Sequence, residues 1–134
     1  MPKEFYIENR VFYHDTDSGG VVYYARYLEH LEESRSEFFR SKGVDLAEWA
    51  KKGAHLPVVH LEVDYKAPAR YGDTIRIFTR LEQMRNSSVI FSQEIKRGEA
   101  VLVKAKTVWA CVGDDFKIRP LPEELKNIFP EQGQ

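Results

Sequence analysis

The sequence is poor in the residues that support disulfide, metal or membrane chemistry. Its 134 residues include one cysteine, Cys111, which excludes an internal disulfide framework and a multi-cysteine metal site. Because Cys111 lies in an apolar run, we predict a buried, inert thiol. A formal net charge of −1 gives no electrostatic basis for binding nucleic acid or an anionic membrane surface.

Long apolar runs and hydrolase motifs are also missing. No stretch is long enough to span a bilayer, and the charged start MPKEFYIENR has no signal-peptide core, so we expect a soluble cytoplasmic protein. The absence of a Gly-x-Ser-x-Gly motif excludes an α/β-hydrolase triad. There are no repeats and no interdomain linker, and the length predicts one domain over residues 1–134 with one core.

One long helix is predicted over residues 21–42, which contain neither proline nor glycine. Gly43 directly follows and suits the position just past a helix end. The residues on or beside one helical face recur near helical spacing. They are Tyr24, Tyr27, Leu28, Leu31, Arg35 and Phe38.

An acidic turn precedes this helix. Asp15 and Asp17 lie just before Gly19 and Gly20, where the glycines would let another molecule approach the helix start closely. A carboxylate there could face a carbonyl whose oxygen is held by the unpaired N–H groups of the first helical turn, which is a geometry suited to acyl transfer. The alternative is that Asp15, Asp17 and Ser18 are ordinary turn and cap residues.

The other apolar residues alternate with a period of two, which predicts strands. These segments are 5–13, 59–66, 74–84, 89–96 and 100–112, and short helices are predicted over 45–52 and 123–129. One strand, one long helix and a meander of four strands predict an α+β fold, a five-stranded antiparallel sheet with the helix packed on one face. His14 beside Asp15 and Asp17 invites a metal interpretation, but nothing supplies the other ligands, so we expect no metal site.

The order of elements and two motifs resemble the hotdog-fold acyl-CoA thioesterases. The motifs are V-F-Y-H-D-T-D-S-G-G-V-V-Y-Y at residues 11–24 and V-D-Y-K-A-P-A-R-Y-G-D at residues 63–73. The subfamily that they resemble contains 4-hydroxybenzoyl-CoA thioesterase and the thioesterase associated with the bacterial Tol–Pal system. The resemblance covers nearly the whole chain and implies a sheet wrapped around the long helix. It also implies a homo-oligomer, dimer or tetramer, with active sites at the subunit interface.

The resemblance implies roles for particular residues. Asp17 corresponds to the catalytic carboxylate, acting as nucleophile or as general base, and the backbone N–H near Tyr24 corresponds to the oxyanion hole. Relatives of the Tol–Pal type carry a histidine at the position of Tyr24, so no histidine acid/base carries over. The expected substrate-binding residues are Gly19, Gly20, Tyr23, Arg85, Ser87 and Ser88.

The predicted function is hydrolysis of an acyl-CoA thioester to free coenzyme A and a carboxylic acid. Coenzyme A is part of the substrate, and we expect no cofactor. Arginine and serine in the turn at 85–88 suit phosphate oxygens, although they also suit a plain hairpin turn. The alternatives are a thioesterase acting on acyl carrier protein and a non-catalytic acyl-CoA-binding sensor. Retention of Asp17 speaks against the sensor, because simple binding does not need an acid at the thioester.

Overall fold

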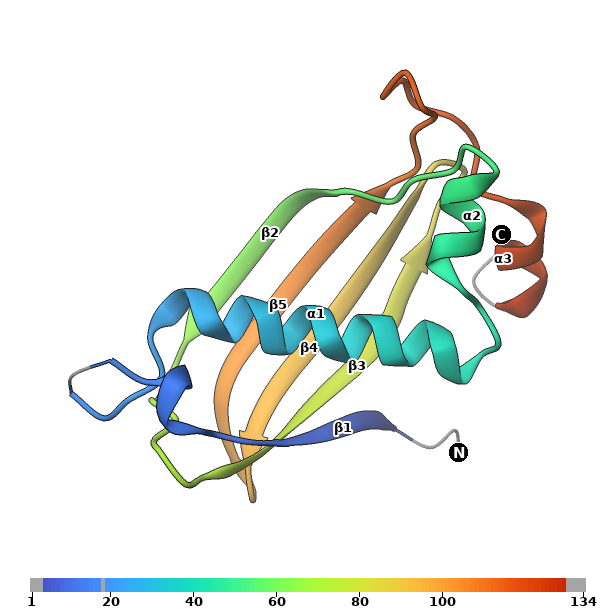
Figure 1. Ribbon diagram of the computed structural model, residues 1–134. Helices are drawn as coiled ribbons and strands as arrows, with labels where there is room; N and C mark the ends of the chain where they lie inside the picture. The colour runs from blue at the N-terminus through green and yellow to red at the C-terminus, as the bar shows by residue number, and fades with distance from the viewer. Residues whose placement is uncertain (1–3, 18, 130–134) are drawn as a thin grey trace. The chain divides into compact units, whose positions relative to one another are not determined.

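The computed structural model describes residues 4–17 and 19–129, which form five strands and one long helix (Figure 1). The strands pair in the order β1-β3-β4-β5-β2, so the predicted α+β class with a five-stranded antiparallel sheet is confirmed. In chain order the elements are β1 (Phe5–Arg10), the 3₁₀ turn η1 (Tyr13–Asp15), α1 (Tyr24–Ser41), α2 (Leu46–Lys51), β2 (Val58–Tyr65), β3 (Thr74–Met84), β4 (Ser88–Arg97), β5 (Ala100–Ala110) and α3 (Glu123–Ile128).

The described chain divides into two compact units, and each is built from separate segments. The first contains residues 4–38 together with Val63–Arg80 and Gln93–Ala105. The second contains Phe39–Glu62, Leu81–Ser92 and residues 106–129. That residues 1–134 form a single domain stays a prediction.

The core of the first unit lies between α1 and the strands, and Figure 1 shows α1 running across them. Tyr27 and Leu31 come from the helix, and they belong to the same buried cluster as apolar side chains of β3, β4 and β5. The fully or nearly buried members are Val11, Val22, Tyr27, Leu31, Ala69, Ile75, Ile77, Ile95, Leu102, Val103 and Ala105.

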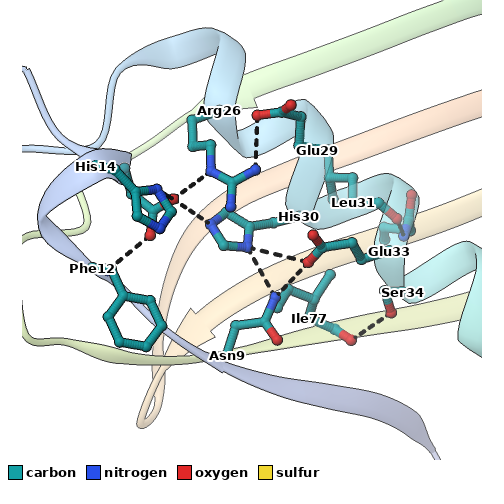
Figure 2. Close-up of polar contacts among 12 residues, drawn as sticks. Asn9, Phe12, His14, Arg26, Glu29, His30, Leu31, Glu33, Ser34 and Ile77 are labelled. Atoms are coloured by element: carbon teal, nitrogen blue, oxygen red, sulfur yellow. Dashed lines mark hydrogen bonds and ion pairs between the residues drawn. The ribbon is translucent and has the colours of Figure 1, made fainter.

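Buried hydrogen bonds also fix α1 on the sheet. The Ser34 hydroxyl donates to the carbonyl oxygen of Ile77 at 2.9 Å (Figure 2). The side-chain amide of Gln93 donates to the Leu31 carbonyl at 2.9 Å and to the Thr79 hydroxyl at 2.8 Å. Because a buried polar group without a partner is costly, these bonds favour one placement of the helix over neighbouring ones.

Two predicted boundaries differ from the structure by three residues, and the others differ by two or fewer. The first strand ends at Arg10 and not at residue 13, because residues 13–15 turn into η1. The helix begins at Tyr24 and not at residue 21. Val21 and Val22 form isolated bridges instead, Val21 with Arg70 and Val22 with Thr16, as suits β-branched residues.

The second unit has an aromatic core of its own. The ring of Phe39 stacks on Trp109 with centroids 5.4 Å apart and meets Phe91 edge-on at 5.6 Å. Cys111 is buried, and burial raises the pKa of its thiol, which agrees with the predicted inert cysteine. Asp45 caps α2 by accepting a hydrogen bond from the N–H of Ala47 at 2.9 Å.

The predicted strand at 59–66 is confirmed as β2, Val58–Tyr65, but its predicted half burial is wrong for the chain alone. β2 lies at the edge of the sheet, and its apolar side chains are exposed, with Val59 at 58%, Leu61 at 38% and Tyr65 at 47%. No described part of the chain covers these side chains fully, so the alternating pattern produces an exposed apolar row.

Within the described part of the chain, no helix combines the length and the apolar character that crossing a membrane requires. The cytoplasmic location stays a prediction.

Candidate active site

Asp17 begins a tight turn at the tip of a small hairpin in the first unit. Its N–H donates to the Val21 carbonyl at 3.0 Å, and its own carbonyl accepts from the N–H of Gly20 at 3.0 Å. Its carboxylate Oδ1 accepts from the N–H of Gly19 at 2.8 Å, and the residue is exposed. The carboxylate is therefore oriented by the backbone of its own turn and stays open to solvent.

The two glycines are required by this turn for different reasons. Gly20 has φ of +80°, which side chains rarely tolerate. At Gly19 a Cβ would lie 3.2 Å from Oδ1 of Asp17 and would crowd the carboxylate. A side chain at Gly20 would strain the backbone of this turn, and one at Gly19 would press on the carboxylate of Asp17.

A second segment, residues 67–73, holds this hairpin in place. The N–H of Val22 donates to the Ala69 carbonyl at 2.9 Å, and the N–H of Tyr71 donates to the Gly20 carbonyl at 3.3 Å. Asp73 closes the segment, because its Oδ2 accepts from the N–H of Arg70 at 2.9 Å and from the Arg97 guanidinium at 2.8 Å. The second motif singled out in the sequence thus supports the first.

The first turn of α1 follows directly. Tyr24 is its first residue and is 72% exposed, and Tyr23 before it is 41% exposed. The first N–H groups of a helix have no partner within it and carry the positive end of its dipole. In this turn the N–H of Arg26 donates to the carbonyl of Tyr23, the residue just before the helix, at 3.0 Å. The N–H groups at the start of α1 and the exposed carboxylate of Asp17 therefore lie within residues 17–26 of the chain.

Tyr27 ties the helix to the supporting segment. Its side chain is buried, and its hydroxyl accepts a hydrogen bond from the N–H of Ala69 at 2.8 Å. We expect Tyr27→Phe to lower the free energy of unfolding by roughly 1–3 kcal/mol, because it leaves a buried N–H without a partner. Urea unfolding checks this value, with the exposed Tyr71→Phe as control; equal stability of the two variants would contradict it.

Asp15 is the buried counterpart of the exposed Asp17. Its Oδ2 accepts from the N–H of Phe12 at 2.8 Å, and its Oδ1 is paired with Nε of Arg26 on α1. Burial opposes its charge, but the hydrogen bonds from Arg26 and Phe12 hold the pKa of Asp15 below its usual value. Asp15 thus joins η1 to α1.

His30 extends this network into the core, as Figure 2 shows. Its Nδ1 lies 2.9 Å from the side-chain amide of Asn9, which also donates to Glu33 at 2.9 Å. Nε2 of His30 is 4.0 Å from Oδ1 of Asp15 and has no hydrogen-bond partner among the described residues. Burial, reinforced by the charge of Arg26, lowers the pKa of His30, so the neutral form is favoured.

The lowered pKa of His30 makes stability depend on pH. A histidine whose pKa is lower in the folded state than in the unfolded state loses stability as the pH falls through the unfolded value of about 6.5. We therefore expect the free energy of unfolding to decrease between pH 7 and pH 5, and His30→Gln to flatten this dependence. Urea titrations at several pH values measure it, and His60→Gln, an exposed site, should keep the wild-type slope. An unchanged slope in His30→Gln would contradict the assignment.

The remaining predicted site residues lie in the second unit. Arg85 and Ser87 lie in the turn between β3 and β4, and Ser88 is the first residue of β4. The N–H of Arg85 donates to the Ser88 carbonyl at 2.8 Å. The Ser87 carbonyl accepts from the N–H of Cys111 at 2.8 Å. Asp17, Gly19, Gly20, Tyr23 and Tyr24 all belong to the first unit.

Histidines do not gather with acidic residues into a metal-binding group in the part of the chain that is described. His14 is exposed beside Asp15, and its Nδ1 lies 3.5 Å from Oδ1 of that residue. His55 pairs with Asp114 at 2.7 Å in the second unit. Sequence reasoning missed the contacts of Arg26 with Asp15 and of Asn9 with His30, because no local motif marks Arg26 or Asn9.

Residues 11–129 match the family model of the thioesterase-like superfamily. The chain belongs to this family. Acyl-CoA thioesterase YbgC of Haemophilus influenzae is 35% identical over 123 residues, which is 90% of each chain. The residues that the family model matches include the hairpin that carries Asp17 and the segment that supports it.

Solved structures agree with the family. A probable thioesterase from Bartonella henselae is 35% identical with a TM-score of 0.83, over 90% of this chain and 100% of that one. The 1,4-dihydroxy-2-naphthoyl-CoA thioesterase of Synechocystis is 26% identical with a TM-score of 0.88, over 98% and 99%. The predicted hotdog fold and the predicted thioesterase class are confirmed.

Proposed function

We propose that the protein hydrolyses acyl-CoA thioesters to free coenzyme A and a carboxylic acid. The observation that carries this proposal is the exposed Asp17, oriented by its own turn just ahead of the first turn of α1. Relatives that match most of the chain are named acyl-CoA thioesterases, which supports the same substrate class.

Asp17 is the proposed catalytic carboxylate. As a general base it removes a proton from water while the water oxygen bonds to the acyl carbon; as a nucleophile it bonds to that carbon first and water then cleaves the anhydride. In both routes the carbon–sulfur bond breaks and the thiolate of coenzyme A leaves and takes up a proton. The N–H of Tyr24 is the proposed donor to the carbonyl oxygen as negative charge develops on it.

The remaining predicted residues have proposed roles in binding. Gly19 and Gly20 let the thioester approach the backbone, and the exposed ring of Tyr23 offers an apolar contact beside them. Arg85, Ser87 and Ser88 suit the phosphate groups of the coenzyme A nucleotide, because a guanidinium and hydroxyls bind phosphate oxygens well. Water is the co-substrate, and the proposed chemistry requires no metal or redox group.

The experiment that tests the substrate class measures thiol release from matched pairs of thioesters. Each acyl group, short-chain, long-chain, benzoyl or phenylacetyl, is offered on coenzyme A and on acyl carrier protein. The proposal predicts a higher kcat/KM for one class of coenzyme A esters. A higher value for the carrier-protein esters would overturn the coenzyme A assignment, and binding without release would favour an acyl-CoA sensor.

The exposed apolar row on β2 supports a homo-oligomer. Val59, Leu61 and Tyr65 point to one side of an edge strand, where a second copy could cover them. Pairing of subunits into a larger sheet is also what the resemblance implies. We therefore propose that two copies associate through β2, whereas a tetramer rests on the resemblance alone.

We expect Val59→Asp to shift the protein toward the monomer, because it places a charge in the apolar row that the second copy covers. Sedimentation equilibrium measures the association constant. Asp64→Asn changes an exposed residue on the opposite side of the same strand and should leave association unchanged. Dimers of equal stability in Val59→Asp would contradict the proposed interface.

A further inference from the structure

Tyr65 makes an unusual contact with the start of α1. It is the last residue of β2 and is 47% exposed, yet its hydroxyl donates a hydrogen bond to the carbonyl oxygen of Tyr24 at 3.1 Å. Its ring lies against that of Tyr27, with centroids 5.6 Å apart. A carbonyl in the first turn of a helix already accepts from the N–H four residues later, so the Tyr65 bond is additional to the helical one.

Two tyrosines thus connect the helix start to the stretch from Tyr65 to Asp73, which includes the segment that supports the Asp17 hairpin. Tyr65 reaches the backbone of Tyr24 from β2, and Tyr27 reaches the backbone of Ala69 from α1. The backbone bond from Val22 to Ala69 joins the same segment to the hairpin. The turn with the carboxylate and the turn with the backbone donors are therefore held to one support.

We propose that Tyr65 is a positioning residue, whose hydroxyl fixes the first helical turn and thereby the N–H of Tyr24 relative to Asp17. This inference rests on the proposed function, in which that N–H binds the developing oxyanion. An oxyanion donor works only if it is held in place before the reaction, because reorienting it would consume part of the stabilisation. A hydrogen bond to the Tyr24 carbonyl restricts the peptide units on both sides of this residue and polarises the one that follows.

The hydroxyl can be removed without disturbing the ring. In Tyr65→Phe the contact with Tyr27 and the apolar surface of β2 remain, and only the bond to Tyr24 is lost. We expect kcat to fall roughly 2- to 10-fold, the equivalent of one uncharged hydrogen bond. KM should stay within about twofold, since Tyr65 touches none of the proposed binding residues, and a kcat effect alone is the sign of an interaction used in the transition state.

The test compares Tyr65→Phe with Tyr71→Phe in the full-length protein. Tyr71 is an exposed tyrosine of the supporting segment whose ring meets Tyr13 edge-on, and its backbone bond to Gly20 survives the substitution. Two readouts are recorded for each variant. One is kcat and KM for the ester that the wild type hydrolyses fastest, and the other is hydrogen exchange of the amides at 24–28, which needs no activity.

The inference predicts that Tyr65→Phe lowers kcat roughly 2- to 10-fold. It also predicts that amide exchange becomes roughly 2- to 10-fold faster, but only in the first turn of α1, and that the melting temperature stays unchanged. Tyr71→Phe should match the wild type in both readouts. Faster amide exchange with an unchanged kcat would overturn the positioning role. Unchanged amide exchange would show that the Tyr65 hydroxyl does not fix the first turn of α1. A wild type that hydrolyses no ester would remove the proposed function and the catalytic consequence, while amide exchange would still decide whether Tyr65 fixes the helix start.

Discussion

Replacing Asp17 by asparagine should lower kcat for thioester hydrolysis by roughly 100-fold or more. The substitution keeps the shape of the side chain, and the amide oxygen can still accept the hydrogen bond from Gly19. What is lost is the negative charge that removes a proton from water or attacks the acyl carbon. Because Asp17 is exposed and holds no other element in place, we expect the fold and KM to change little.

A matched carboxylate serves as the control for this variant. Asp64→Asn makes the same chemical change at an exposed position of the first unit that the proposed mechanism does not use. It should leave kcat unchanged. Stopped-flow or continuous detection of the released thiol gives both values, and equal kcat in Asp17→Asn and in wild type would remove Asp17 from the mechanism.

Asp15→Asn should have the largest effect on stability. Removing one partner of a buried ion pair leaves the other charge uncompensated, which costs about 3–5 kcal/mol in proteins. The side chain of Asp15 is 1% exposed and that of Arg26 is 18% exposed. Arg26 retains its contact with Glu29 at 2.8 Å, so we expect a loss near the lower end, about 3 kcal/mol.

Glu29→Gln measures the contribution of the second ion-pair partner of Arg26 separately from that of Asp15. Glu29 is 62% exposed, and exposed ion pairs contribute about 0–1 kcal/mol, so its removal should change stability little. Denaturant unfolding at pH 7 compares the two variants. A loss in Asp15→Asn as small as that in Glu29→Gln would show that the buried pair does not hold η1 to α1.

Features with a local cause could be predicted from the sequence. The strand over 74–84 has the predicted bounds, because Gly72 and Asp73 break the chain directly before it. The end of α1 was also predicted, since Gly43 adopts φ of +78°, as a glycine just past a helix does. The Asp17 turn belongs to this class, because its glycines and its carboxylate interact within a few residues.

Features that depend on distant pairing could not be predicted. Asn9 and His30 meet across 21 residues, and Tyr65 and Tyr24 meet across 41. Such contacts depend on the register of strands and on the rotation of the helix, which local periodicity does not determine. The helix start was placed too early because residues 21–22 have no helix breaker, whereas their bridges to Thr16 and Arg70 become visible only in three dimensions.

The exposed face of β2 shows a second limit of prediction from the sequence. Alternation of Val59, Leu61 and Tyr65 with polar residues identifies a strand with one apolar side, but it does not say what covers that side. In the single chain nothing described covers much of it. The pattern therefore carries information about an assembly as well as about the fold.

The most direct test of the central claim is the number of coenzyme A molecules released per chain from an acyl-CoA ester. The account predicts continuous release over many turnovers by the wild-type protein, with water as the only other reactant. Release that stops at one equivalent would contradict it, because the acyl group would then remain on the protein without being hydrolysed. Tight binding of the ester with no release at all would also contradict it and would identify the protein as a binding module.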